Sequence, residues 1–103
     1  MTKYGLHGKL SATPGNGEKL AQILLQASQL VSTATGCQLY LVSRDQSDLD
    51  SVWVTEVWDS KTDHDNSLQV DGVKELIAKA MPLLAGRPEK GQELEVLGGA
   101  GLQ

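Results

Sequence analysis

Apolar and polar residues alternate at the start of the chain, which predicts a β-strand over residues 4–12. Leu6 and Leu10 fall on one face of this strand, and His7 and Lys9 fall on the other. A short segment of Pro and Gly residues follows and is expected to end the strand.

The next stretch has apolar residues at steps of three and four, which predicts an amphipathic helix of about five turns. Asn16 precedes it as a suitable N-cap, and Gly36 is expected to close it. The apolar face consists of Leu20, Ile23, Leu24, Ala27, Leu30, Val31 and Ala34.

Alternation returns in residues 37–44 and again in residues 51–58, which are rich in β-branched and aromatic types. Only a short polar turn, residues 45–50, separates these two predicted strands. Because they are sequential and closely connected, we expect them to pair as an antiparallel hairpin.

A second helical region follows the hairpin. Ser60 and Asp63 resemble a capping box at its start, and Asp71 is placed to cap a second segment after a pause. Pro82 lacks an N–H group and is expected to kink or end that segment. The apolar stripe of the second segment consists of Val73, Leu76, Ile77, Ala80 and Met81.

A loop over residues 86–91 leads to a last short strand, residues 92–97. The order strand, helix, strand, strand, helix, strand predicts an α+β, ferredoxin-like βαββαβ fold. Right-handed crossovers place both helices on one face of a four-stranded antiparallel sheet. We interpret residues 1–103 as a single domain, with a core over residues 3–97 and a flexible or arm-like C-terminal tail, residues 98–103.

Both faces of the predicted sheet carry large apolar groups. In the third strand, Val54 and Trp58 share one face, whereas Trp53 and Val57 share the other. Helices on one side leave the other face open, and a large exposed apolar patch indicates a partner surface. We therefore predict a homodimer that forms through the sheet face; the alternative is a monomer with an exposed apolar sheet.

Composition and charge exclude several classes of protein. The net charge is −4 and the nine Lys and Arg residues are scattered, so no nucleic-acid surface is expected. No apolar run approaches the roughly 20 residues that span a bilayer, and the N-terminus runs directly into a strand pattern, which we interpret as cytoplasmic. A single cysteine, Cys37, excludes an internal disulfide and a thiolate metal site, and we interpret it as a small hydrophobic residue at a strand start.

Three segments together resemble the antibiotic biosynthesis monooxygenase (ABM) family, over roughly residues 3–97. The first strand is followed by TPGNGEKLAQILLQ, and Gly36 and Cys37 are followed by an alternating strand that contains Tyr40. The third and most specific segment is TEVWDSKTDHDNSL, residues 55–68. It is similar to the family's Glu-x-Trp-(Glu/Asp)-Ser-(Lys/Arg) pattern through Glu56, Trp58, Asp59, Ser60 and Lys61.

The sequence departs from the family pattern on the short helix. Many members carry a His at the position of Ser67, whereas His64 lies one helical turn earlier. The heme-degrading branch of the family uses an Asn on the first strand, and that strand offers His7 and no Asn. The resemblance therefore argues against heme degradation.

The resemblance implies a dimeric α/β barrel and cofactor-independent monooxygenation of a quinol or polycyclic phenol. The deprotonated substrate gives an electron to dioxygen, so the protein supplies a base, a dry pocket and hydrogen-bond donors. No cofactor and no metal are implied. The candidate catalytic residues are His7, Tyr40, Trp58 and His64.

Each candidate also has a structural interpretation. His7 is the preferred base, but it is equally suited to a hydrogen-bonded position or to the dimer interface. The acidic neighbours of His64 favour a solvated helix position. Trp58 suits the core, and Glu56, on the same face, would pair with a basic residue such as Lys9 or Arg44.

Other functions remain open from sequence alone, because a fold does not determine a function. One is a non-catalytic dimeric module that binds a small apolar ligand. The other is an isomerase or a heme-degrading enzyme on the same fold.

Overall fold

Four strands form one antiparallel sheet in the order β2-β3-β1-β4. The computed structural model describes residues 2–101. Strand β1 lies in the middle of the sheet, between β3 and β4, which confirms the predicted topology. The strands are β1 (Lys3–Ser11), β2 (Cys37–Asp45), β3 (Asp48–Trp58) and β4 (Gln92–Val96).

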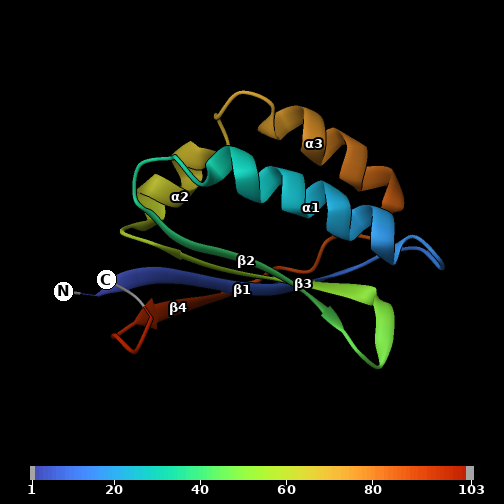
Figure 1. The fold of residues 1–103 in the computed structure, drawn as a ribbon, viewed down its shortest axis with the longest axis horizontal. Coiled ribbons are helices and arrows are strands. Elements are labelled where there is room, and N and C mark those ends of the chain that lie inside the picture. Colours follow the sequence, from blue (N-terminus) through green and yellow to red (C-terminus); the bar gives the residue numbers. More distant parts are fainter. Residues whose placement is uncertain (1, 102–103) are drawn as a thin grey trace.

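The helices all cover the same face of this sheet and leave the other face bare (Figure 1). They are α1 (Gly17–Val31), α2 (Lys61–Ser67) and α3 (Val73–Ala80), and a 3-10 turn (Met81–Leu83) follows α3. The α+β, ferredoxin-like architecture is therefore confirmed, whereas the dimer stays a prediction. Within residues 2–101, no helix is both long and apolar enough to cross a bilayer.

Helix α1 begins where it is predicted to begin, directly after Asn16, but its cap and its C-terminal end differ from the prediction. It ends at Val31 rather than near Gly36, because turns occupy the residues between them. Asn16 makes no side-chain cap, since its amide donates to Thr13 Oγ1. Asp50 on β3 takes the capping role instead, because its Oδ1 accepts the Gly17 N–H at 3.0 Å. A strand residue distant in sequence thus satisfies the start of the helix.

The β2–β3 hairpin is longer than predicted. Its strands extend to Asp45 and Asp48, so the turn is shorter than the predicted residues 45–50. The predicted cap by Asp71 is also wrong, because Gly72 precedes α3 with a φ of +91°, a left-handed conformation that favours glycine. The caps and breaks predicted at Ser60 and Pro82 are confirmed: Ser60 Oγ accepts from the Asp63 N–H, and α3 ends just before Pro82.

The core lies between the helices and the covered face of the sheet. One cluster joins Leu20 and Leu24 of α1 to Val52 and Val54 of β3. A second cluster surrounds the fully buried Trp58. Between the clusters, the side chains of the two layers do not fill the space completely.

Candidate active site

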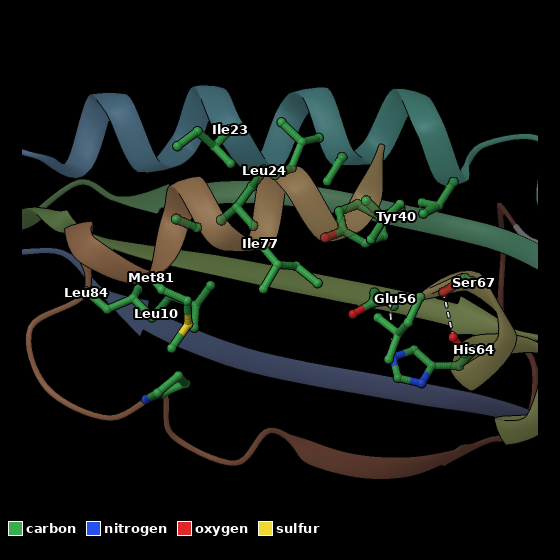
Figure 2. Close-up of a pocket in the computed structure, with 17 residues that line it drawn as sticks. Leu10, Ile23, Leu24, Tyr40, Glu56, His64, Ser67, Ile77, Met81 and Leu84 are labelled. Carbon is green, nitrogen blue, oxygen red and sulfur yellow. Dashed lines mark hydrogen bonds and ion pairs between the residues drawn. The ribbon is translucent and has the colours of Figure 1, made fainter. Parts of the chain in front are cut away.

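A cavity of about 240 Å³ lies between the helices and the covered face of the sheet (Figure 2). Seventeen residues line it, and only four of them are polar: Tyr40, Glu56, His64 and Ser67. The apolar lining side chains come from α1, β1 and α3, from Leu68 after α2, and from the segment after α3. A mostly apolar cavity with a few polar groups is typical of a small-molecule site.

The polar groups gather at one end of the cavity. Figure 2 shows Glu56, His64 and Ser67 together, whereas Leu10 and Met81 lie toward the opposite end. The cavity therefore has a polar end on β3 and α2 and an apolar end near the segment that follows α3. A ligand with one hydroxylated end and an apolar body matches this polarity.

Glu56 is the buried carboxylate at the polar end. It is 9% exposed, and its Oε1 accepts a hydrogen bond from Trp58 Nε1 at 3.0 Å. Burial raises the pKa of Glu56 above its ordinary value, while the Trp58 hydrogen bond and the nearby His64 act in the opposite direction. The other carboxylate oxygen of Glu56, Oε2, makes no hydrogen bond to the described part of the chain. Within residues 2–101, every fully buried side-chain oxygen has a hydrogen-bond partner, so Oε2 is not fully buried and is reachable from the cavity that Glu56 lines.

His64 lies beside Glu56, and the prediction of a solvated position is wrong. Its side chain is only 16% exposed, and its Nε2 is 3.8 Å from Glu56 Oε1. The ring lies edge-on to Trp58, with 6.0 Å between ring centroids, and 5.6 Å from the ring of Tyr4. Because Ser60 sets the start of α2, His64 lies on the side of the helix that faces the sheet.

Ser67 stands one helical turn after His64 and lines the same cavity. It is buried, and its hydroxyl donates to the His64 carbonyl oxygen. Residues three positions apart lie on the same face of a helix, so His64 and Ser67 can both face the cavity without any change in the register of α2. His64 and Ser67 therefore border the same space.

Tyr40 adds a phenol to the cavity. It lies on β2, directly opposite Glu56 on the neighbouring strand. Burial, followed by the Glu56 carboxylate, raises the pKa of Tyr40 well above its usual range. The phenol therefore stays protonated, and its hydroxyl has no hydrogen-bond partner among the described residues. It is available as a donor to a ligand.

His7 lies on the bare face of the sheet, away from this cavity. Its Nδ1 is 2.9 Å from Thr55 Oγ1, and its ring stacks on Trp53 with 4.9 Å between centroids. The structure thus brings Tyr40 and His64 to the cavity, places Trp58 behind Glu56, and separates His7 from all three. The predicted alternation of Trp53 and Trp58 between the two faces is confirmed.

Glu56 does not pair with the basic residues suggested by the sequence. Arg44 instead binds Glu18 and the Leu49 carbonyl oxygen at the far end of the hairpin. The prediction named a basic residue as the partner of Glu56, whereas the groups nearest to its carboxylate are Trp58 of β3 and His64 of α2. The shared strand face of Glu56 and Trp58 was the available signal that this carboxylate belongs to the site.

Within residues 2–101, no cluster of three or more His, Cys, Asp or Glu residues is arranged to hold a metal ion. Cys37 is a free thiol beside the Trp58 cluster, and burial raises its pKa. It is thus less nucleophilic than an exposed thiol. The ionisable side chains that line the cavity are Tyr40, Glu56 and His64.

Comparisons with known proteins agree on one family. A family model described as antibiotic biosynthesis monooxygenase matches residues 4–79. A crystal structure provisionally assigned to the same family, from Chloroflexus aurantiacus J-10-fl, is 40% identical, with a TM-score of 0.87 over 98% of this chain and 99% of that one. No curated protein matches the chain.

More distant structures share the fold alone. A provisionally assigned antibiotic biosynthesis monooxygenase from Caulobacter crescentus CB15 has a TM-score of 0.83 at 20% identity, over 94% of this chain and 92% of that one. A protein of unknown function from Nitrosomonas europaea has a TM-score of 0.79 at 24% identity, over 96% and 93% of the two chains.

Proposed function

The chain belongs to the antibiotic biosynthesis monooxygenase family, and on that premise we propose that it oxidises a quinol or polycyclic phenol with dioxygen. The observation that carries the proposal is the Glu56 carboxylate at the polar end of an otherwise apolar cavity. A carboxylate whose pKa is raised by burial is a stronger base than an exposed one.

The overall reaction is balanced by one molecule of each reactant. A quinol and dioxygen give a hydroxyquinone and water, so four electrons pass from the ring to dioxygen. One oxygen atom replaces a ring hydrogen and becomes a hydroxyl or carbonyl oxygen, and the other leaves as water. The substrate supplies all of the electrons, so the protein needs only to control protons, position and solvation.

Glu56 begins the reaction by accepting a proton from a ring hydroxyl of the substrate. The resulting quinolate gives one electron to dioxygen, and the ring radical and superoxide combine at a ring carbon. Protonation gives a hydroperoxide, and loss of the ring C–H proton with cleavage of the O–O bond releases water. Tyr40 donates a hydrogen bond to the anionic oxygen, and the apolar walls exclude water.

Charge restricts the substrate class. No Lys or Arg lines the cavity, whose ionisable side chains are Tyr40, Glu56 and His64. A phosphate or carboxylate group would lose its hydration there without a counter-charge and would approach the Glu56 carboxylate. We therefore expect a neutral hydroxylated aromatic substrate, which disfavours an isomerase that acts on phosphorylated compounds.

The volume of the cavity limits the number of rings in the substrate. A cavity of about 240 Å³ exceeds the roughly 150 Å³ apolar cavity that holds benzene. A second space of about 190 Å³ adjoins it and shares Leu10, Leu24, Tyr40 and Glu56 as lining residues. We therefore expect the main cavity to hold two fused rings, with a third ring reaching toward the adjoining space. The open volume favours an enzyme over a module whose core is filled by side chains.

The bare face of the sheet supports the proposed homodimer. Leu41 and Leu94 lie on this face and are 49% and 48% exposed, and Trp53 lies between their strands. A two-fold packing of two bare faces would cover these side chains. Sedimentation at micromolar concentration should give twice the chain mass of 11.0 kDa. Leu41→Lys should shift the protein to a single chain, and an 11 kDa species in the wild type would contradict the dimer.

Oxygen uptake with a set of ring compounds tests the activity. The set contains a one-ring hydroquinone, a naphthoquinol, an anthrone and a naphthoquinol that carries a carboxylate. We expect uptake above the buffer rate with the two neutral fused-ring compounds and the least with the carboxylated one. Glu56→Gln should lower kcat by about 10²-fold or more, the usual contribution of a positioned general base.

Glu75→Gln is the matched control, because Glu75 is an exposed carboxylate on α3. It should leave the uptake unchanged. Absence of enzyme-dependent uptake with every compound would defeat the proposal. Equal loss in both Glu→Gln variants would show that charge in general, and not the buried carboxylate, is required.

A further inference from the structure

Three side chains form a row from the cavity to the surface of the molecule. Glu56 borders the cavity and has an 11% exposed side chain, His64 follows at 16%, and Asp65 is 54% exposed. His64 Nε2 points to Glu56 Oε1 at 3.8 Å, and His64 Nδ1 is 3.0 Å from Asp65 Oδ1. One imidazole therefore lies between a buried and an exposed carboxylate.

We propose that Asp65 is a positioning residue that keeps the neutral His64 ring protonated on Nδ1, so that the bare Nε2 faces Glu56 and holds the substrate's proton during the reaction. The catalytic part of this inference rests on the proposed function. The tautomer part depends only on the contacts of His64.

Asp65 can select the tautomer because an ionised carboxylate only accepts hydrogen bonds. The nitrogen that faces it must carry the hydrogen, so Nδ1 is the donor and Nε2 is left with a lone pair. Asp65 is ionised near neutral pH, since the His64 hydrogen bond, first among several causes, lowers its pKa from the ordinary 3.8. The same logic orients the histidine of a catalytic triad.

The surroundings of the ring hold it in place. Tyr4 of β1 and Trp58 of β3 contact its faces and edge, and the Tyr4 hydroxyl donates to Glu93, so it does not compete for His64. Lys61 Nζ lies 3.7 Å from Asp65 Oδ2, whereas His64 contacts the other carboxylate oxygen, Oδ1. The charged groups near His64 are thus two carboxylates and the amine that pairs with one of them.

The proton transfer involves no change in electrons. The O–H bond of protonated Glu56 breaks as an N–H bond forms at His64 Nε2, and the imidazolium is stabilised by Asp65. The 3.8 Å gap is roughly 0.8 Å longer than a hydrogen bond, so a small rotation of either side chain must close it. The transfer restores the Glu56 carboxylate. The reverse transfer returns the proton to the outer peroxide oxygen, which gives the hydroperoxide, and the ring C–H proton completes the water when the O–O bond breaks.

Nitrogen NMR of the two histidines tests the tautomer without any substrate. In the wild type at alkaline pH, we expect His64 to show a protonated Nδ1 and a bare Nε2. Asp65→Ala should abolish this preference and give a mixture of tautomers. His7 is an internal control in the same spectrum, because it lies on the other face of the sheet and should not respond.

Lys61→Met is the matched variant, since it removes the ion pair with Asp65 but keeps the His64–Asp65 contact. It should retain the wild-type tautomer. A proton on Nε2 in the wild type, or the same tautomer ratio in Asp65→Ala, would overturn the inference. Asp65 is exposed, so its replacement is not expected to prevent folding.

Kinetics test the catalytic part separately. With a quinol that the wild type oxidises, Asp65→Ala should lower kcat about tenfold, the low end of what orienting partners contribute, with little change in KM. An unchanged kcat together with a lost tautomer preference would overturn the proton-holding role. If no quinol is oxidised by the wild type, the proposed function and the proton-holding role fail together, and the NMR result alone decides the tautomer assignment.

Discussion

A histidine and a tryptophan lie together on each face of the sheet, but their surroundings differ. On the covered face, His64 lies beside Trp58 and a buried carboxylate, and it borders a cavity. On the bare face, His7 stacks on Trp53 and contacts a threonine hydroxyl. Residue type alone therefore does not identify a site. The covered face gains its chemistry because the helices exclude water and bring a histidine to Glu56.

The tryptophans should show the largest difference between the faces. Trp58 is fully buried and donates to Glu56, so Trp58→Ala should lower the free energy of unfolding by about 3–5 kcal/mol. Trp53 is partly exposed on the bare face, and Trp53→Ala should act mainly by weakening the proposed dimer. Urea denaturation at several protein concentrations measures both effects.

The concentration dependence separates the two tryptophan variants. The loss caused by Trp58→Ala should be the same at every concentration, because its packing lies within one chain. The loss caused by Trp53→Ala should shrink on dilution, since a dimer gains stability by mass action. A concentration-independent loss of equal size in both variants would remove the distinction between the faces.

Replacing the two histidines should give the second-largest difference between the faces, and this difference should appear in the activity. His64→Ala removes the group beside Glu56 and should lower kcat of quinol oxidation by about 10²-fold, equivalent to about 2.7 kcal/mol. His7→Ala tests the base that the sequence favoured, and its position on the bare face predicts a weaker dimer instead of slower chemistry. Steady-state oxygen uptake measures kcat, and sedimentation measures association. A larger loss of kcat in His7→Ala than in His64→Ala would assign the chemistry to the other face.

The sequence predicted the fold well because the evidence for it is local. Alternation placed Trp58 and Glu56 on one face and Trp53 on the other, and each assignment needs only neighbours in the same strand. The end of α1 was missed because Ala34 continues the three- and four-residue spacing of the apolar face into residues 32–36, which form turns. Its capping group was missed because the carboxylate that accepts the Gly17 N–H, Asp50, comes from a strand.

The site was harder to predict because its contacts join separate elements. His64 has acidic neighbours and looked solvated, yet Ser60 sets the phase of α2 so that His64 faces the sheet. Trp58 of β3 donates to Glu56, but the second neighbour of this carboxylate, His64, is on α2, which no pattern within β3 reveals. Ser60 as N-cap was the one local signal that could have placed His64 toward the sheet.

The smallest expected effect is a pH dependence that comes from Glu56. Burial raises its pKa above the ordinary 4.5, so the folded protein binds this proton more tightly than the unfolded chain. The stability that Glu56 contributes is therefore complete below about pH 4.5 and is lost as the pH rises through the raised pKa. The slope for one group cannot exceed about 1.4 kcal/mol per pH unit.

Unfolding of the wild type and of Glu56→Gln in urea from about pH 4 to 8 isolates this term as a difference curve. Asp59, Asp65 and Glu93 have lowered pKa values, so their contribution has the opposite sign, but it is common to both proteins and cancels. We expect the wild type to lose stability relative to Glu56→Gln as the pH rises. A flat difference curve would mean that Glu56 has the same pKa in the folded protein as in the unfolded chain. Burial on the covered face would then not make it a stronger base than a carboxylate exposed to water.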